Sequence, residues 1–203
     1  MLTALLIAHL LPHGGVSPVE ALVHSAGWGF QHIIPNGLDH IAFVLGLFFL
    51  ARRMQFLVAQ VAVFTVAHSA ASALAMLGRI AVPEIWVEIA VALSIAFVAV
   101  ENLWGENLRR WRMAMVGVFG LIHGLAYAHS FAEMPVGGTV RTIALTGFNL
   151  GVGLGQMAVI GLAFLLAAPV WSKGWYRSHV AIPASCAIGL CGLLWAVERS
   201  LAL

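Results

Sequence analysis

His32, Asp39 and His40 lie within one short stretch of the chain, and Asp39 is its only aspartate. Asn36 lies between them, and the apolar run 41–51 follows directly. Imidazole and carboxylate groups are metal ligands, and an ionisable side chain inside a bilayer is costly enough to indicate a site by default. The stretch therefore predicts a functional site within a hydrophobic segment.

Histidine is unusually frequent in this sequence. The chain has nine histidines against eight carboxylates, and Lys173 is its single lysine. Because histidine is the commonest metal ligand in proteins, this composition favours a metal site before any spacing is considered.

The composition is that of an integral membrane protein. Of the 203 residues, 62% are hydrophobic and 9% are charged, with a mean hydropathy of +0.98. A soluble domain is about 45–50% apolar and about 25% charged. The length suits one helical bundle surrounded by lipid, and the charged loops are too short to form a nucleic-acid surface. A homo-oligomer remains possible.

We expect an all-α, polytopic fold with six transmembrane helices in one bundle, since each apolar run is near the ~20 residues that a span needs. Residues 28–203 form this domain, and residues 1–27 form a short external or interfacial segment in which Pro18 opens an amphipathic helix. The six predicted spans are 28–51, 54–77, 84–104, 113–131, 142–169 and 180–201.

Basic residues indicate the orientation of the bundle. If every span crosses once, seven positive charges fall on one side, and three fall on the other. The positive-inside rule then places both termini outside the cytoplasm, in a bacterial-type inner membrane. The seven are Arg52, Arg53, Arg109, Arg110, Arg112, Lys173 and Arg177, and the three are Arg79, Arg141 and Arg199.

In this orientation, polar residues from five spans fall in the outer half of the membrane. The predicted metal ligands are His32, Asp39, His40, His68 and His123. The residues predicted to line a vestibule or support the ligands are Asn36, Ser69, Glu88, His129, Asn149 and Gln156. Imidazole suits zinc, copper, iron and nickel alike, so the ligands do not fix the metal.

His32 and Asp39 would stand about 10 Å apart on a straight helix, too far to bind one ion. Pro35 and Gly37 lie between them, and proline removes a backbone hydrogen bond. We therefore expect a break at 34–37, of the kind that lines ion sites in membrane proteins.

Simpler interpretations remain open for single residues. His68 alone could bond a serine or carbonyl, Asn149 and Gln156 could join helices, and Asp39 could orient a histidine rather than bind metal. Cys186 and Cys191 are five residues apart, on different faces of one helix, so we expect buried packing thiols and no disulfide between them.

Several stretches together resemble the HupE/UreJ membrane protein family, in particular its second group. They are HIIPNGLDHIAFVLGLFFL (32–50), FTVAHS (64–69), VEIAVALSIAFVAVEN (87–102), FGLIHGLAYA (119–128), FNLGVGLGQ (148–156), IPAS (182–185) and WAVER (195–199). The resemblance implies six membrane helices and nickel or cobalt permeation. The resemblance also implies that His32, Asp39, His40 and His123 occupy motif positions that look like metal ligands in the family. His68 and Glu88 are further candidates.

The chain departs from the family pattern at three points. Gly153 stands where the fifth-span motif usually has glutamate, and Gln31 stands where relatives can carry an acid. His32 is separated from Asp39 by one residue more than in nickel-associated members. These differences leave room for another metal, or for binding without transport.

Three functions are therefore considered. The first is uptake of a divalent transition metal (nickel, cobalt, zinc or copper) from the external side. The second is an intramembrane zinc hydrolase, in which three imidazoles hold the ion and leave one position open for water. The third is a haem-binding protein with two histidines on facing helices.

Overall fold

The computed structural model describes residues 17–51, 53–76, 78–80, 82–104, 111–126 and 138–202. Within these ranges the regular structure is entirely helical, which confirms the all-α prediction. The elements are α2 (Pro18–Ile33), α3 (Leu38–Leu50), α4 (Met54–Met76), α5 (Glu84–Trp104), α6 (Arg112–Ala126), α8 (Gly138–Trp171), the π-helix η1 (Arg177–Ala181) and α9 (Ile182–Ser200).

The long helices suit a membrane. Met54–Ala75, Thr139–Trp171 and Arg177–Ser200 are each long and apolar enough to span one, and α2 with α3 passes the same test as a bent pair. Leucines cover the outer surfaces of these helices; Leu165 is 72% exposed. Such a surface is stable in lipid rather than in water. The described helices thus give three or four candidate spans, fewer than the six expected.

α2 begins at Pro18, as the sequence predicts. The Ser17 hydroxyl accepts a hydrogen bond from the Glu20 backbone N–H, while the Glu20 carboxylate accepts one from the Ser17 N–H. This reciprocal capping satisfies two backbone donors at the helix start. The helix then runs without interruption to Ile33, so the predicted segment boundary after residue 27 falls inside it.

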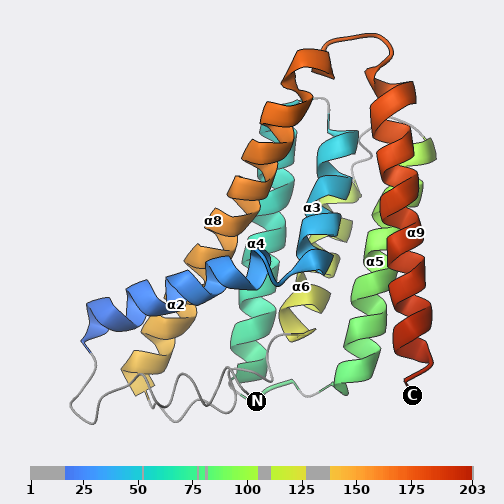
Figure 1. The fold of residues 1–203 in the computed structure, drawn as a ribbon. Helices are drawn as coiled ribbons and strands as arrows, with labels where there is room; N and C mark the ends of the chain where they lie inside the picture. The colour runs from blue at the N-terminus through green and yellow to red at the C-terminus, as the bar shows by residue number, and fades with distance from the viewer. Residues whose placement is uncertain are drawn as a thin grey trace.

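The predicted break between His32 and Asp39 is confirmed. α2 ends at Ile33, α3 begins at Leu38, and their axes differ by 70°. Pro35 in the turn has no N–H to continue the helix. Gly37 is required by close approach, because a Cβ there would collide with the His32 carbonyl. Figure 1 shows α2 running across the bundle, while α3 lies along it.

Close backbone contacts join the helices in pairs. α2 packs on α8, α4 on α6 and α5 on α9. Gly151 lies against the Ala26 carbonyl of α2, and Gly124 lies against the His68 carbonyl of α4. At both positions the absence of a side chain lets two helix backbones come together, as is common in membrane helix packing.

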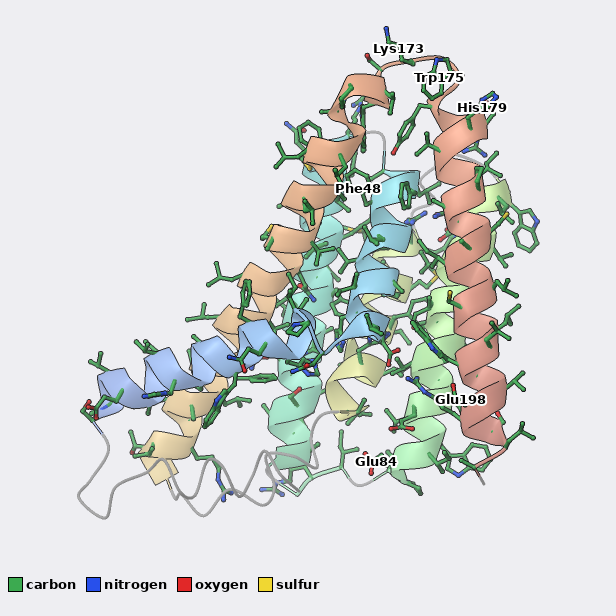
Figure 2. All side chains as sticks on the ribbon, in the orientation of Figure 1. Phe48, Glu84, Lys173, Trp175, His179 and Glu198 are labelled. Atoms are coloured by element: carbon green, nitrogen blue, oxygen red, sulfur yellow. The ribbon has the colours of Figure 1, made fainter. Side chains whose placement is uncertain are left out.

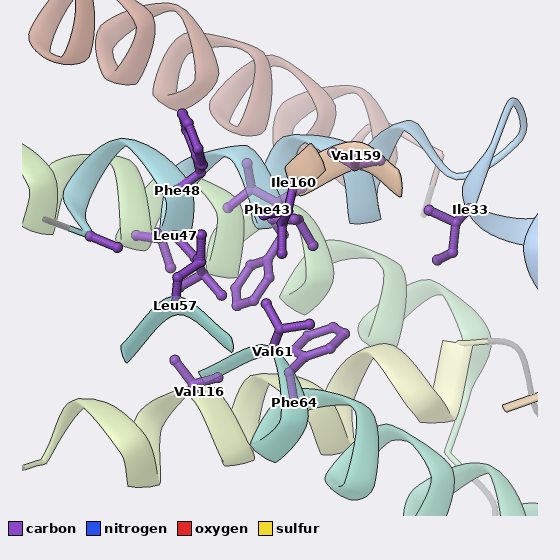
Figure 3. Packing of buried hydrophobic residues seen from close by; sticks show 14 of the residues in the cluster. Ile33, Phe43, Leu47, Phe48, Leu57, Val61, Phe64, Val116, Val159 and Ile160 are labelled. Atoms are coloured by element: carbon purple, nitrogen blue, oxygen red, sulfur yellow. The ribbon is translucent and has the colours of Figure 1, made fainter. Parts of the chain in front are cut away.

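A hydrophobic core surrounds α3. Phe43, Leu47, Leu57, Phe64 and Val116 are almost fully buried and belong to one cluster (Figure 3). Because α3 is covered by neighbours on several sides, the side chains at its start are held in fixed positions.

The two ends of the bundle differ in charge. The α8–η1 connection lies at one end with Lys173, and the C-terminus lies at the other with Glu84 and Glu198 (Figures 1 and 2). Arg53 precedes α4 and Arg112 begins α6 at the Lys173 end, which agrees with the side that the sequence predicts to be basic.

The prediction for the two cysteines is half right. Cys186 and Cys191 form no disulfide, but both are exposed rather than buried. α9 is apolar around most of its circumference, so hydropathy alone does not reveal which side faces its neighbours.

Candidate metal centre

The bend between α2 and α3 brings two histidines together. His32 lies in the last turn of α2, and His40 lies in the first turn of α3. On a straight helix they would stand about 12 Å apart along the axis. In the bent pair their ring centroids are 4.7 Å apart, with the rings edge to face.

α4 adds a third ring to this pair. The His68 ring centroid lies 5.6 Å from that of His40 and 6.3 Å from that of His32. Each of the three residues offers a ring nitrogen, and these nitrogens lie within 4.8 Å of one another. We call this group, His32, His40 and His68, the three-histidine cluster.

The cluster lies in a mostly buried, aromatic environment. His68 is fully buried and His40 is 5% exposed, whereas His32 is only partly buried. Phe64 stacks on His68, and Phe148 lies 5.5 Å from the His32 ring. His32 is therefore the member closest to the surface.

Several lone pairs and N–H groups here lack a protein partner. Within the described ranges, His40 Nε2 makes no hydrogen bond, and neither does the Gln156 Nε2 amide. Neither ring nitrogen of His68 makes a hydrogen bond of acceptable geometry, although Asn149 lies beside it. A buried polar group without a partner costs about 1–3 kcal/mol. Together with the convergence of three imidazoles, these buried polar atoms favour a site for a ligand.

His123 lies next to the cluster. Its ring centroid is 5.0 Å from that of His40, and its Nε2 is 2.9 Å from the Ser94 hydroxyl. Ser94 donates its single proton to the Val91 carbonyl, at 2.6 Å, so it accepts from His123. His123 Nε2 therefore carries the proton, and the buried Nδ1 keeps its lone pair.

α8 contributes amide side chains beside the histidines. Thr65 of α4 donates to Gln156 Oε1 at 2.6 Å and to the Val61 carbonyl at 2.8 Å, so the two bonds share one hydroxyl proton. Asn149 donates to the Leu145 carbonyl, and its Oδ1 is buried without a hydrogen bond inside the described ranges. Gln156 joins α8 to α4, as the simpler interpretation expects, whereas Asn149 bonds within its own helix. Each amide retains a buried atom for which the described part of the chain provides no hydrogen-bond partner.

Asp39 is engaged elsewhere. Its Oδ2 lies 2.8 Å from Arg199 Nη2 of α9, and Arg199 Nη1 donates to the Glu88 carbonyl at 2.8 Å. Both charged side chains are partly exposed. Asp39 is next to His40 in the sequence, but its carboxylate pairs with Arg199. Glu88 takes part through its backbone carbonyl, which accepts a hydrogen bond from Arg199.

The other predicted vestibule residues are scattered. Asn36 is exposed in the turn between α2 and α3. Ser69 donates to the Thr65 carbonyl of its own helix. His129 lies outside the described residues. His24 and His179 are exposed.

Sequence reasoning missed Ser94 and the role of Arg199. A lone serine in an apolar helix carries no recognisable signal. Arg199 belongs to the WAVER stretch, and its place after a long apolar run suggested only a terminal charge.

A comparison with known families identifies the family of this chain. A family model described as "HupE / UreJ protein" matches residues 13–199, nearly the whole chain. The chain belongs to the HupE/UreJ family. Searches of curated proteins and of solved structures found no match.

This HupE/UreJ protein is thus a helical membrane protein with a cluster of histidines suited to a transition metal. The donor set consists of neutral imidazoles, which bind borderline divalent cations and leave calcium or magnesium to oxygen-rich sites.

Proposed function

We propose that this protein binds a divalent transition-metal ion at the three-histidine cluster and carries it across the membrane. The observation that supports the proposal is the convergence of His32, His40 and His68 from three helices, where His40 and His68 bury ring nitrogens for which the described residues provide no hydrogen-bond partner. Two nitrogens bound to one ion at about 2.1 Å lie roughly 3–4 Å apart, so modest ring rotations suffice.

The proposal includes six crossings. In it, α2 with α3 forms one broken span, and α4, α5, α6, α8 and η1–α9 supply the others. Broken helices at ion sites are a recurring feature of transporters. The basic end, with Arg53 and Lys173, faces the cytoplasm, and the end with Arg199 faces the periplasm.

His123 offers the ion a second position. Its Nδ1 lone pair lies beside His40 and deeper in the bundle than the partly exposed His32. Conduction needs coordination that is weak or divided among several positions, because a closed four-ligand site would trap the ion. Three imidazoles with a fourth nearby meet this condition. Nickel or cobalt is the cargo that family membership favours.

Uptake of nickel and cobalt into cells tests the proposal. We expect His40→Ala and His68→Ala to abolish accumulation at equal expression. His179→Ala is the matched control, because it removes an exposed imidazole far from the cluster and leaves uptake unchanged. Wild-type accumulation in both cluster variants would remove the proposal.

The three-imidazole group also matches the donor set of catalytic zinc, which keeps the intramembrane hydrolase as a second candidate. Ser69, the hydroxyl next to His68 in sequence, donates to the Thr65 carbonyl of its own helix. The two functions differ in how readily the bound metal ion is released. A hydrolase retains one zinc ion through purification and treatment with a chelator, whereas a carrier loses its ion readily.

A further inference from the structure

A cavity of about 330 Å³ lies at the basic end of the bundle, where the end of α3, the end of α8 and η1 meet. The end of α8 and η1 come together at the top of Figure 1, far from the bend that holds the three-histidine cluster. None of the metal-site residues lines it, so its role is separate from that of the cluster.

The lining of the cavity is amphiphilic. Phe49, Leu50 and Trp171 supply apolar walls, and Lys173 and Arg177 supply two positive charges. The described residues that line the cavity include no carboxylate. Figure 2 shows Lys173 at the end of the molecule, beyond the last turn of α8.

Tyr176 adds a hydrogen-bond donor. Its hydroxyl is buried and finds no partner in the described part of the chain, and its ring lies 5.3 Å from that of Trp171. Burial raises the pKa of this hydroxyl above its usual value, so it keeps its proton. A buried O–H without an acceptor fits an incoming anion.

We propose that this cavity binds the phosphate headgroup of an anionic phospholipid. The two cations and the Tyr176 hydroxyl hold the phosphate, and the start of an acyl chain lies against Trp171, Phe49 and Leu50. Basic pockets between membrane helices on the cytoplasmic side bind anionic headgroups in this way, and tryptophan and tyrosine favour the same interfacial depth. Arg177 also donates to the Asn102 carbonyl at 3.5 Å, which ties the site to α5.

Native mass spectrometry of the full chain in detergent tests the proposal. The probes are phosphatidylglycerol and phosphatidylcholine with identical acyl chains, titrated at matched concentrations. We expect one phosphatidylglycerol to bind preferentially. Lys173→Gln should weaken it about fivefold, and Lys173→Gln with Arg177→Gln about thirtyfold, because each cation contributes ~1 kcal/mol to anionic lipid binding.

Two further variants make the test specific. Tyr176→Phe keeps the aromatic wall and removes only a hydroxyl that has no protein partner, so it should fold normally and bind phosphatidylglycerol about tenfold more weakly. Arg53→Gln removes an exposed positive charge at the same end, outside the cavity, and should leave binding unchanged.

Three results would overturn the inference. Equal loss in Arg53→Gln and Lys173→Gln would indicate general charge attraction. Unchanged binding in both Lys173→Gln and Tyr176→Phe would remove the cavity from the interaction, even if the double variant does not fold. Full competition by millimolar inorganic phosphate would assign the site to free phosphate rather than to a lipid.

Discussion

Two regions of this molecule bury polar side chains, and they do so differently. At the basic end, Arg112 is 1% exposed and lies 3.3 Å from the Glu101 carboxylate and 3.2 Å from Gln60 Oε1. Glu101 supplies the opposite charge, although the Arg112 Nη atoms and Glu101 Oε2 form no hydrogen bond of acceptable geometry within the described ranges. At the bend, His40 and His68 bury ring nitrogens for which the described residues provide no hydrogen-bond partner.

The difference separates a structural contact from a binding site. A base buried beside an acid is compensated within the fold, and removing either partner leaves an uncompensated charge. Imidazole nitrogens gathered around one point, without partners among the described residues, are compensated by a metal ion or a hydrogen-bonding molecule from outside the fold. The comparison predicts opposite responses to mutation in the two regions.

The largest effect is expected at the ion pair. Arg112→Met should lower the free energy of unfolding by about 3–5 kcal/mol, because Glu101 is left as a mostly buried charge. Denaturant unfolding in detergent measures this. Arg112→Met with Glu101→Leu should recover most of the loss, and a double variant as unstable as the single one would contradict this account.

The three-histidine cluster should respond in the opposite way. Without metal, His68→Leu should raise the free energy of unfolding by about 1–3 kcal/mol, since a buried group without a partner is removed. The same variant should bind the metal more than about a hundredfold more weakly. Loss of a residue that only hydrogen-bonds to a ligand already costs about 10–100-fold, and His68 is proposed as a ligand itself. Unfolding with and without metal measures both. A less stable apo variant would show that His68 is compensated within the fold.

Ser94 tests whether His123 takes part. Ser94→Ala removes the acceptor of the His123 Nε2 proton, so the ring is free to change tautomer and metal affinity should fall about tenfold. Nitrogen NMR of the histidine rings reports the tautomer directly. Ser185→Ala removes another buried serine, bonded to Asn102, and should change neither the tautomer nor the affinity.

The smallest effect is expected at the partly exposed pair of Asp39 and Arg199. Arg199→Gln should lower the free energy of unfolding by about 0.2–1 kcal/mol and change metal affinity less than about threefold. Isothermal titration with nickel measures the affinity. A tenfold gain would mean that Asp39 is a ligand which Arg199 normally withholds.

The sequence predicted the parts of this structure that depend on local chemistry. Pro35 and Gly37 indicated the break, and His32 and His40, on either side of it, were both predicted as metal ligands. The partner of Asp39 could not be found in this way, because Arg199 is 160 residues away in the chain. Contacts between helices depend on how each helix is rotated, and nearly uniform apolar helices carry little periodic signal of that rotation. The same limit explains the wrong burial predicted for Cys186 and Cys191.

X-ray absorption of the purified protein loaded with one equivalent of nickel tests the central claim most directly. This account predicts imidazole scattering from at least three nitrogens at about 2.1 Å, reduced in His40→Ala and unchanged in His179→Ala. A spectrum of oxygen ligands alone, or one identical in His40→Ala, would contradict the assignment of the metal to His32, His40 and His68.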